Sequence, residues 1–328
     1  MAIITYTQAM NDALREEMER DPRVFVMGQD VGPFGGIFGE TRGLYEVFGP
    51  QRVIDTPISE TLIVGAGVGA AITGMRPVAQ LQFADFIAIA MDEVANKAGK
   101  WRYMHGGLFE VPLVIFAPIG AIAGAGPEHS QCPEAWLIHA LGLKVVLPAT
   151  PADAKGLLKA AIRDPNPVVY LPHKALATIT GEVPEGDVIT PIGQARIARE
   201  GSDVTVVTYS AMVHKTLQAA ERAAAEGISV EVIDLRSLVP LDIETILASV
   251  NRTGRLIVAH EAPLDGGAAA DIVARVVERA FFALDAPVKR VCGANVPIPQ
   301  SAYLEPFCFP QADDILAAIR ELAAGRAA

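Results

Sequence analysis

The second half of the sequence alternates short apolar segments with longer segments of helical spacing, and this pattern constrains the fold most. The predicted strands, which are rich in Val and Ile, are 204–210, 228–235, 255–260 and 287–291. The predicted helices are 213–227, 242–250, 267–283 and 313–324. Strands that are apolar on both sides and alternate with helices indicate a parallel sheet covered on both faces.

The first half shows the same alternation with longer, glycine-rich connections. Thr7 is expected to cap a helix over 7–20, and Ser59 a second helix that starts near it. The other predicted helices are 86–100 and 151–162, and the predicted strands are 23–28, 78–82, 112–116, 144–149 and 167–171.

Residues 173–193 have no clear period and contain both Gly and Pro, so they are interpreted as the connection between two domains. The predicted fold class is α/β, with two doubly wound domains that have largely parallel sheets. The expected boundaries are 1–180 for the first domain, 181–200 for the linker and 201–328 for the second domain.

Composition argues against several classes of function. The chain has 27 Lys and Arg against 38 Asp and Glu, and this net charge of −11 disfavours nucleic acid and anionic membranes as partners. The three cysteines are too few and too scattered for a disulfide framework or a zinc site. The charged N-terminus is unlike a signal peptide, and no apolar run reaches the ~18 residues of a membrane span. We therefore expect a soluble, cytoplasmic protein.

A dinucleotide-binding fingerprint is the first alternative to consider. Gly65, Gly67 and Ala70 have G-x-G-x-x-A spacing, and Asp85 follows at about the expected distance. Gly74 and Pro77 come too soon after them for the crossover helix that should carry the pyrophosphate. We instead expect the glycines to lie inside a helix, where their cost of ~1 kcal/mol each implies close packing or an interface.

A serine hydrolase is also disfavoured. The sequence lacks a G-x-S-x-G elbow, and His129 and Ser130 are adjacent, a spacing that rarely aligns a nucleophile with its base. Two segments remain as candidate sites, 55–60 and 120–136. The structural alternatives are an ordinary helix start at Glu60, with a carboxylate favoured by the helix dipole, and a surface histidine at His129.

Six segments, in order along nearly the whole chain, resemble one known family. They are DTPISE, GMRPVAQLQFADF, GPEHSQCPEAW, LKVVLPATPADAKGLLKAAIRDPNPVVYL, EVIDLRSLVPLD and HEAPLDGGAA. Together they resemble the beta subunit of the thiamine-diphosphate-dependent 2-oxoacid dehydrogenases, which act on pyruvate, branched-chain 2-oxoacids or acetoin. The resemblance implies a pyrimidine-binding domain followed by a transketolase C-terminal-type domain. It also implies an assembly of two alpha and two beta chains, which delivers acyl groups to a lipoyl acyltransferase carrier.

The resemblance assigns candidate site residues. Glu60 matches the glutamate that hydrogen-bonds the aminopyrimidine ring and promotes loss of a proton from the thiazolium carbon. Ile58, Gln82 and Phe86 match positions that line the pyrimidine pocket. His129 matches the active-site histidine, which would orient the substrate carboxylate and donate a proton during transfer to the lipoyl group.

The resemblance also concerns metal ions. It implies a structural potassium ion held by Leu113, Ala161, Ile162, Asp164 and Asn166. The alternative is an Asp–Pro–Asn–Pro turn that needs no metal. The G-D-G…N motif that binds magnesium and diphosphate is absent, and the nearest match, Asp265-Gly266-Gly267 with Asn295, lacks the leading Gly. Magnesium and the diphosphate are therefore expected on the alpha subunit.

Two other functions stay open on the sequence. One is a split transketolase-like subunit that moves two-carbon units between sugars, although the catalytic loops are poor in Lys and Arg. The other is a non-catalytic assembly subunit. The sequence also leaves the substrate open among pyruvate, acetoin and branched-chain 2-oxoacids.

Overall fold

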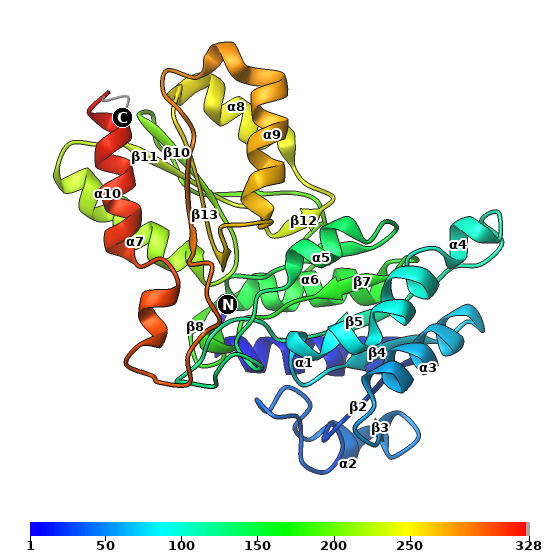
Figure 1. Cartoon of the computed structure of the whole chain (residues 1–328). Coiled ribbons are helices and arrows are strands. Elements are labelled where there is room, and N and C mark those ends of the chain that lie inside the picture. The colour runs from blue at the N-terminus through cyan, green and yellow to red at the C-terminus, as the bar shows by residue number, and fades with distance from the viewer. Residues whose placement is uncertain (326–328) are drawn as a thin grey trace. The chain divides into compact units, whose positions relative to one another are not determined.

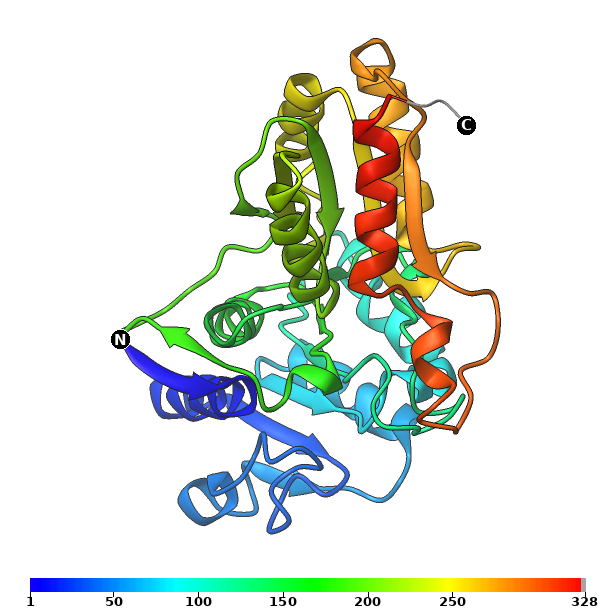
Figure 2. The ribbon, with the colours of Figure 1, turned by 90° about the vertical axis from the view of Figure 1, so that its left-hand side faces the viewer.

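The computed structural model describes residues 1–325, which divide into two units (Figures 1 and 2). The first unit comprises Met1–Gly120 and Trp136–Ile192. The second comprises Ala121–Ala135 and the chain from Gly193 onward. Each unit has its own mainly parallel sheet, so the predicted α/β class with two layered domains is confirmed.

The first unit is built on a parallel sheet. In spatial order its strands are β6 (Lys144–Val146), β7 (Val168–Tyr170), β5 (Val114–Phe116), β4 (Arg76–Gln80), β2 (Val24–Gly28) and β3 (Val53–Asp55). Its helices include α1 (Tyr6–Arg20), α2 (Leu44–Phe48), α3 (Glu60–Ile72), α4 (Trp101–Met104), α6 (Pro151–Arg163) and the short η3 (Lys174–Leu176). Every residue of β2, β5 and β7 is buried, as expected for strands covered on both faces.

The second unit has a sheet with strands in the order β14 (Lys289–Gly293), β13 (Leu256–Pro263), β10 (Val204–Thr208), β11 (Val230–Asp234) and β9 (Arg196–Arg199). All neighbours are parallel except β9, which pairs antiparallel at one edge. Figure 1 shows α7 (Met212–Ala225) and α10 (Ala312–Ala323) on one face, and α8 (Ile243–Thr253) and α9 (Ala268–Ala280) on the other. Further short elements are β12 (Ser237–Val239), η4 (Phe281–Ala283) and η5 (Glu305–Cys308).

Two predictions about the first helices need correction. Thr5, not Thr7, caps α1, because its hydroxyl accepts from the Gln8 amide at 3.1 Å. Thr7 lies in the first turn and donates to the Ala177 carbonyl at 3.0 Å. A helix does begin beside Ser59, but among residues 1–325 the Ser59 side chain makes no capping hydrogen bond.

The predicted helix over 86–100 was also wrong in type. The segment forms a 3₁₀ helix, η1 (Ala84–Ala90), followed by a π-helix, η2 (Asp92–Ala98). Helical spacing in the sequence does not distinguish these hydrogen-bond patterns from an α-helix. Wide π turns are often found near functional sites.

The segment predicted as a linker, 181–200, contains regular structure. Residues Thr180–Val183 form β8, which pairs antiparallel with β1 (Ala2–Thr5), and 196–199 form β9. Asp187 makes ion pairs with Lys159 and Arg163 at 2.6 and 2.7 Å. The polar part of the segment is therefore attached to α6. Residues 121–135, expected in the first domain, group with the second unit, and α5 (Glu134–His139) crosses the division.

The glycine-rich segment that mimics a dinucleotide fingerprint lies inside α3, as expected. A Cβ added at Gly67 would lie 2.9 Å from Leu113 Cδ1 and 3.3 Å from Ala79 Cβ. The glycine therefore allows α3 to pack closely on the sheet, which confirms the close-packing interpretation. Across residues 1–325, no helix combines the length and the apolar character that a membrane span requires.

Candidate active site

Glu60 is the first residue of α3, on the connection that leaves the carboxyl end of β3. Its side chain is half-buried, and Ile58, two residues earlier, is 74% exposed. In parallel α/β sheets, ligands bind in crevices outside the carboxyl ends of the strands. The position of Glu60 therefore suits contact with a ligand better than a role in the core.

Gln82 and Phe86 follow the carboxyl end of β4. Because β3 and β4 pair with opposite sides of β2, these residues share one sheet edge with Glu60. Gln82 Nε2 donates to Asp30 Oδ2 at 2.9 Å, and Phe86 packs edge-to-face on Phe83 with ring centroids 5.9 Å apart. The structure thus places a carboxylate, an amide and an aromatic pair at one edge of the sheet, a combination of polar and aromatic groups that fits an aminopyrimidine ring.

The glycine-rich loop after β2 is held against this edge by a buried carboxyl group. Glu40 accepts from Gln80 Nε2 and, at 2.9 Å, from the Phe38 amide. Burial raises the pKa of the Glu40 carboxyl above its usual value. A Cβ added at Gly36, whose φ is +80°, would lie 2.6 Å from Glu40 Cδ, so the loop needs glycine there.

A buried cation lies beside the aromatic pair and was not predicted from the sequence. Lys174 Nζ is 4.0 Å from Asp85 Oδ2 and 4.9 Å from the centre of the Phe83 ring. Both charged side chains are almost fully buried. The pair could not be predicted from the sequence, because the two residues are 89 positions apart and share no local spacing.

His129 belongs to the second unit, in the segment 121–135, and is half-buried. Its amide donates to the Gly126 carbonyl at 3.3 Å, which closes a tight turn around the residue. Glu60 belongs to the first unit, so the two predicted catalytic residues are carried by different units.

The residues predicted to hold potassium lie close together in the first unit. They are Leu113, Ala161, Ile162, Asp164 and Asn166. Asp164 Oδ1 accepts from the amide and the side chain of Asn166 at 2.9 and 3.1 Å. The carbonyl of Leu113 accepts from Val168 N at 2.9 Å, and that of Ala161 from Asp164 N at 3.3 Å.

Three side-chain cations reach the same cluster of oxygens. Arg76 donates to the carbonyl oxygens of Ile162 and Asp164 at 2.7 and 3.3 Å. Lys144 pairs with the Asp164 carboxylate, and Arg102 donates to Asn166 Oδ1 at 2.8 Å. The oxygens are of the type that hard cations prefer, and their field already attracts positive charge.

The second unit holds a cluster of buried polar side chains. Tyr209 donates to Glu134 Oε1 at 2.7 Å, and the Tyr209 ring stacks on His260 at 6.0 Å. His260 Nδ1 lies 3.0 Å from the Ala262 carbonyl, which can only accept, so Nδ1 carries the proton. Cys292 Sγ lies 3.4 Å from the other ring nitrogen.

Burial shifts the titration of each group in this cluster. It raises the pKa of Glu134 to about 7, and the nearby Glu261 adds to the rise. It lowers the pKa of His260 to about 4 and raises that of Cys292 to about 11. The thiol and the imidazole are therefore both neutral near pH 7, so Cys292 is suited to packing and not to nucleophilic chemistry.

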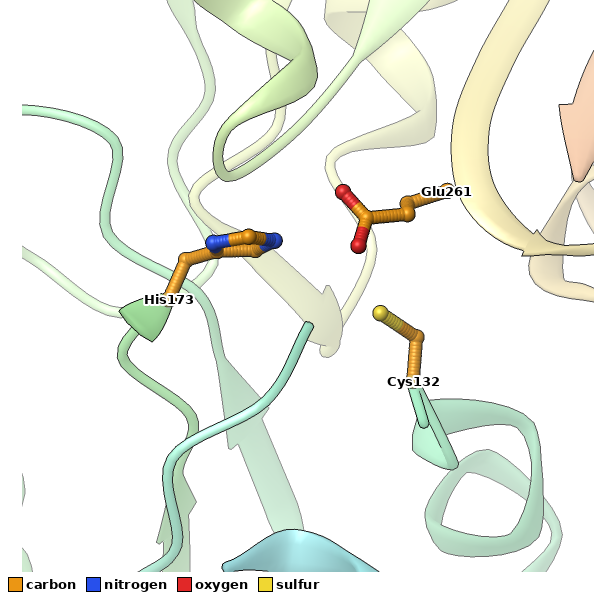
Figure 3. Close-up of side chains that lie close together, drawn as sticks. All are labelled: Cys132, His173 and Glu261. Atoms are coloured by element: carbon orange, nitrogen blue, oxygen red, sulfur yellow. The ribbon is translucent and has the colours of Figure 1, made fainter. Parts of the chain in front are cut away.

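Figure 3 shows Glu261 and Cys132, which both belong to the second unit and whose ligand atoms lie within 4.8 Å of each other. His173, also labelled there, belongs to the first unit, where its ring occupies the space that a Cβ on Gly120 would need. In the segment that resembles a magnesium motif, Asn295 Oδ1 accepts from the Asp265 amide at 3.0 Å. Asn295 therefore braces a loop.

Comparison with known proteins defines the class of the chain. Residues 2–179 match the family model "Transketolase, pyrimidine binding domain", and residues 193–315 match "Transketolase, C-terminal domain". A solved structure titled "Split gene transketolase, inactive beta4 tetramer" is similar, with a TM-score of 0.80, 25% identity and 98% of both chains covered. The chain is thus a two-domain protein of the transketolase type.

More closely related sequences narrow the family. The 2-oxoisovalerate dehydrogenase subunit beta of Bacillus subtilis is 47% identical, over 98% of this chain and 99% of the relative. Pyruvate dehydrogenase E1 component subunit beta-1 of Arabidopsis thaliana is 49% identical, over 96% and 88%. Acetoin:2,6-dichlorophenolindophenol oxidoreductase subunit beta of Cupriavidus necator is 47% identical, over 97% and 96%. The chain belongs to this family of E1 beta subunits of 2-oxoacid and acetoin dehydrogenases.

Proposed function

We propose that this chain is the beta subunit of a cytoplasmic, thiamine-diphosphate-dependent 2-oxoacid or acetoin dehydrogenase. In this function it decarboxylates or cleaves the substrate and passes the acyl group to a lipoyl carrier, in an assembly of two alpha and two beta chains. The observation that carries the proposal is Glu60, which stands half-buried at the sheet edge of a pyrimidine-binding domain.

The residues of this chain would hold the pyrimidine end of the cofactor. When bound, thiamine diphosphate would supply an electron sink for cleavage of the substrate carbon–carbon bond. Glu60 would hydrogen-bond the pyrimidine nitrogen and share a proton with it. Phe86 and Ile58 would contact the ring, and the Gln82 amide would supply polarity. Magnesium and the diphosphate belong to the alpha subunit, because the G-D-G…N motif is absent here.

Calorimetric titration of thiamine diphosphate and magnesium tests this division of the site. We expect tight binding when the chain is mixed with its alpha partner, weak binding to the chain alone, and loss of binding in a Glu60→Ala mixture. Full binding and turnover by the isolated chain would contradict the proposal. Equal binding by the Glu60 variant would favour a non-catalytic assembly subunit.

A split transketolase is the second candidate, favoured by the similarity to the split-gene transketolase structure. Identity to that structure is 25%, against 47–49% to dehydrogenase beta subunits, so the dehydrogenase is the better supported function. A turnover screen of the reconstituted pair against three 2-oxoacids, acetoin and a ketose phosphate separates the two and identifies the substrate.

His129→Ala is expected to slow acyl transfer to the lipoyl carrier by about 10²-fold, because a positioned general acid contributes on that order. Decarboxylation measured with an artificial electron acceptor should change much less. The two assays are run on the same assembled preparation, with His214→Ala as a control on α7 of the same unit. Equal losses in both assays would remove this role from His129.

We also propose a structural potassium ion at Asp164, Asn166 and the carbonyl oxygens of Leu113, Ala161 and Ile162. A bound ion stabilises the folded state by mass action, so the unfolding temperature should rise in potassium chloride relative to choline chloride of equal ionic strength. Asp164→Asn should reduce this difference. An unfolding temperature independent of potassium would mean that the side-chain cations satisfy these oxygens by themselves.

A further inference from the structure

The segment that carries His129 is irregular, and its conformation depends on contacts elsewhere in the second unit. Turns closed by Ala125 N to the Ile122 carbonyl at 3.1 Å and by His129 N to the Gly126 carbonyl at 3.3 Å hold its two halves. Ala123 has φ +47°, a conformation that is unfavourable for a residue with a Cβ. Such strain persists only where surrounding contacts enforce it.

One of these contacts comes from a buried carboxylate far along the sequence. Glu305 Oε2 accepts from the Gly124 amide at 2.7 Å, across 181 residues. Glu305 is only 6% exposed and begins η5, where its own amide donates to the Ser301 carbonyl at 2.9 Å. A hydrogen bond shielded from water by burial is stronger than one exposed to solvent, and leaving the Gly124 amide unsatisfied would be costly.

Close backbone packing gives a second, independent contact at the same point. Gly124 has φ +76°, and a Cβ there would overlap the Gln300 carbonyl oxygen and lie 3.0 Å from Ala302 N. Gly126 has φ +85°, and its added Cβ would lie 3.5 Å from Gln300 Cβ. The turn before His129 therefore rests on the 300–305 segment, with Glu305 at the contact.

The start of the segment is fixed in a similar way. Glu261 Oε1, at the end of β13, accepts from the Ala121 amide at 2.9 Å. The segment is therefore held by carboxylates at Ala121 and Gly124, and His129 lies five residues beyond the second of these contacts.

We propose that Glu305 is a positioning residue for His129, which fixes the turn at Gly124 and thereby sets the place of the imidazole during acyl transfer. This inference rests on the proposed function of His129. It extends that function to a residue that does not itself touch the substrate. A misplacement of ~1 Å in a catalytic group can cost about 10²-fold in rate, so a single hydrogen bond at this turn can matter for catalysis.

Two variants test the proposal in the chain assembled with its alpha partner. Glu305→Ala removes the acceptor, and Glu305→Gln keeps one oxygen that can still accept from Gly124 N. In Glu305→Ala, amide hydrogen exchange over 121–129 should accelerate by about tenfold or more, and lipoyl transfer should fall by about 10- to 100-fold. Decarboxylation with the artificial acceptor should stay within about twofold, because Glu60 is untouched.

Glu305→Gln should restore most of the transfer rate and of the exchange protection. Glu278→Ala, on the exposed side of α9 in the same unit, is the matched control and should change neither. In a His129→Ala background, Glu305→Ala should slow transfer little further, because both changes act through one imidazole. If Glu305→Ala does not fold, Glu305→Asp, which shortens the side chain by one methylene, takes its place.

Unchanged exchange over 121–129 in Glu305→Ala would overturn the proposal, as would a Gln variant that is as defective as the Ala variant. A different result would contradict the proposed function of His129. Equal loss of both activities in His129→Ala alone would remove the catalytic role of His129, while the exchange measurement would still decide whether Glu305 holds the turn.

Discussion

Glu60→Gln is expected to lower turnover of the assembled enzyme by about 10²–10⁴-fold while the fold stays intact. Glutamine matches glutamate in size but cannot share a proton with the pyrimidine nitrogen, so the step that activates the cofactor loses its acid–base partner. Glu60 is half-buried at the first position of α3, where a negative charge gains only about 0.3–1 kcal/mol from the helix dipole. The free energy of unfolding should therefore change little. Steady-state turnover and circular dichroism on one preparation check both statements.

Glu46→Gln provides the matched control for this prediction. Glu46 is also a glutamate in the first turn of a helix of the first unit, but its side chain is exposed and lies outside the candidate site. The control should retain wild-type turnover. Near-normal turnover in Glu60→Gln or Glu60→Ala would remove Glu60 from the mechanism and leave the ordinary helix start as its explanation.

The sequence predicted those parts of the fold that depend on local patterns. The segments rich in Val and Ile became β2, β5, β7, β10 and β11, because strands buried on both faces are mostly apolar. It also predicted that the glycines of α3 lie inside a helix, because too few residues follow them for a crossover. The strands β8 and β9 were not predicted, because they are short edge strands of mixed polarity, and edge strands carry little hydrophobic signal.

The support of the candidate site could not be predicted, because it depends on contacts between distant residues. Glu305 and Gly124 are 181 residues apart, and Glu134 and Tyr209 are 75 apart. Neither pair lies on a common helix or strand with a recognisable spacing. In the sequence, nothing distinguishes Glu305 from an ordinary polar residue, because its partner is evident only in the folded structure.

Glu134→Gln is expected to change how stability depends on pH. The Glu134 carboxyl is fully buried, and among residues 1–325 its Oε2 has no hydrogen-bond partner. Its pKa is raised from 4.5 to about 7, mainly by burial. Between these two pH values only the unfolded chain is ionised, so unfolding releases a proton and stability falls as pH rises. The total loss is about 3 kcal/mol, and it levels off above about pH 7.

Protonation of His260 changes the free energy of unfolding with pH in the opposite direction, over nearly the same pH range. Burial lowers its pKa from 6.5 to about 4, so between these values only the unfolded chain takes up the proton. Its contribution to stability is therefore lost as pH falls, again by about 3 kcal/mol in total. The slopes from Glu134 and His260 nearly cancel between about pH 4.5 and 6.5 in the wild-type protein.

Glu134→Gln removes the contribution of Glu134 to the pH dependence of the free energy of unfolding. The variant keeps an oxygen that can accept from Tyr209. Relative to the wild type, the variant should gain about 3 kcal/mol between pH 4.5 and pH 8, and its own stability should fall more steeply below pH 6.5. Urea unfolding at a series of pH values measures this difference, with the exposed Glu278→Gln as the control whose curve should parallel the wild type. A constant difference between Glu134→Gln and wild type at all pH values would mean that Glu134 ionises equally in both states. The carboxyl at the end of the His129 segment would then have to be hydrated, and not sealed in the core of the second unit.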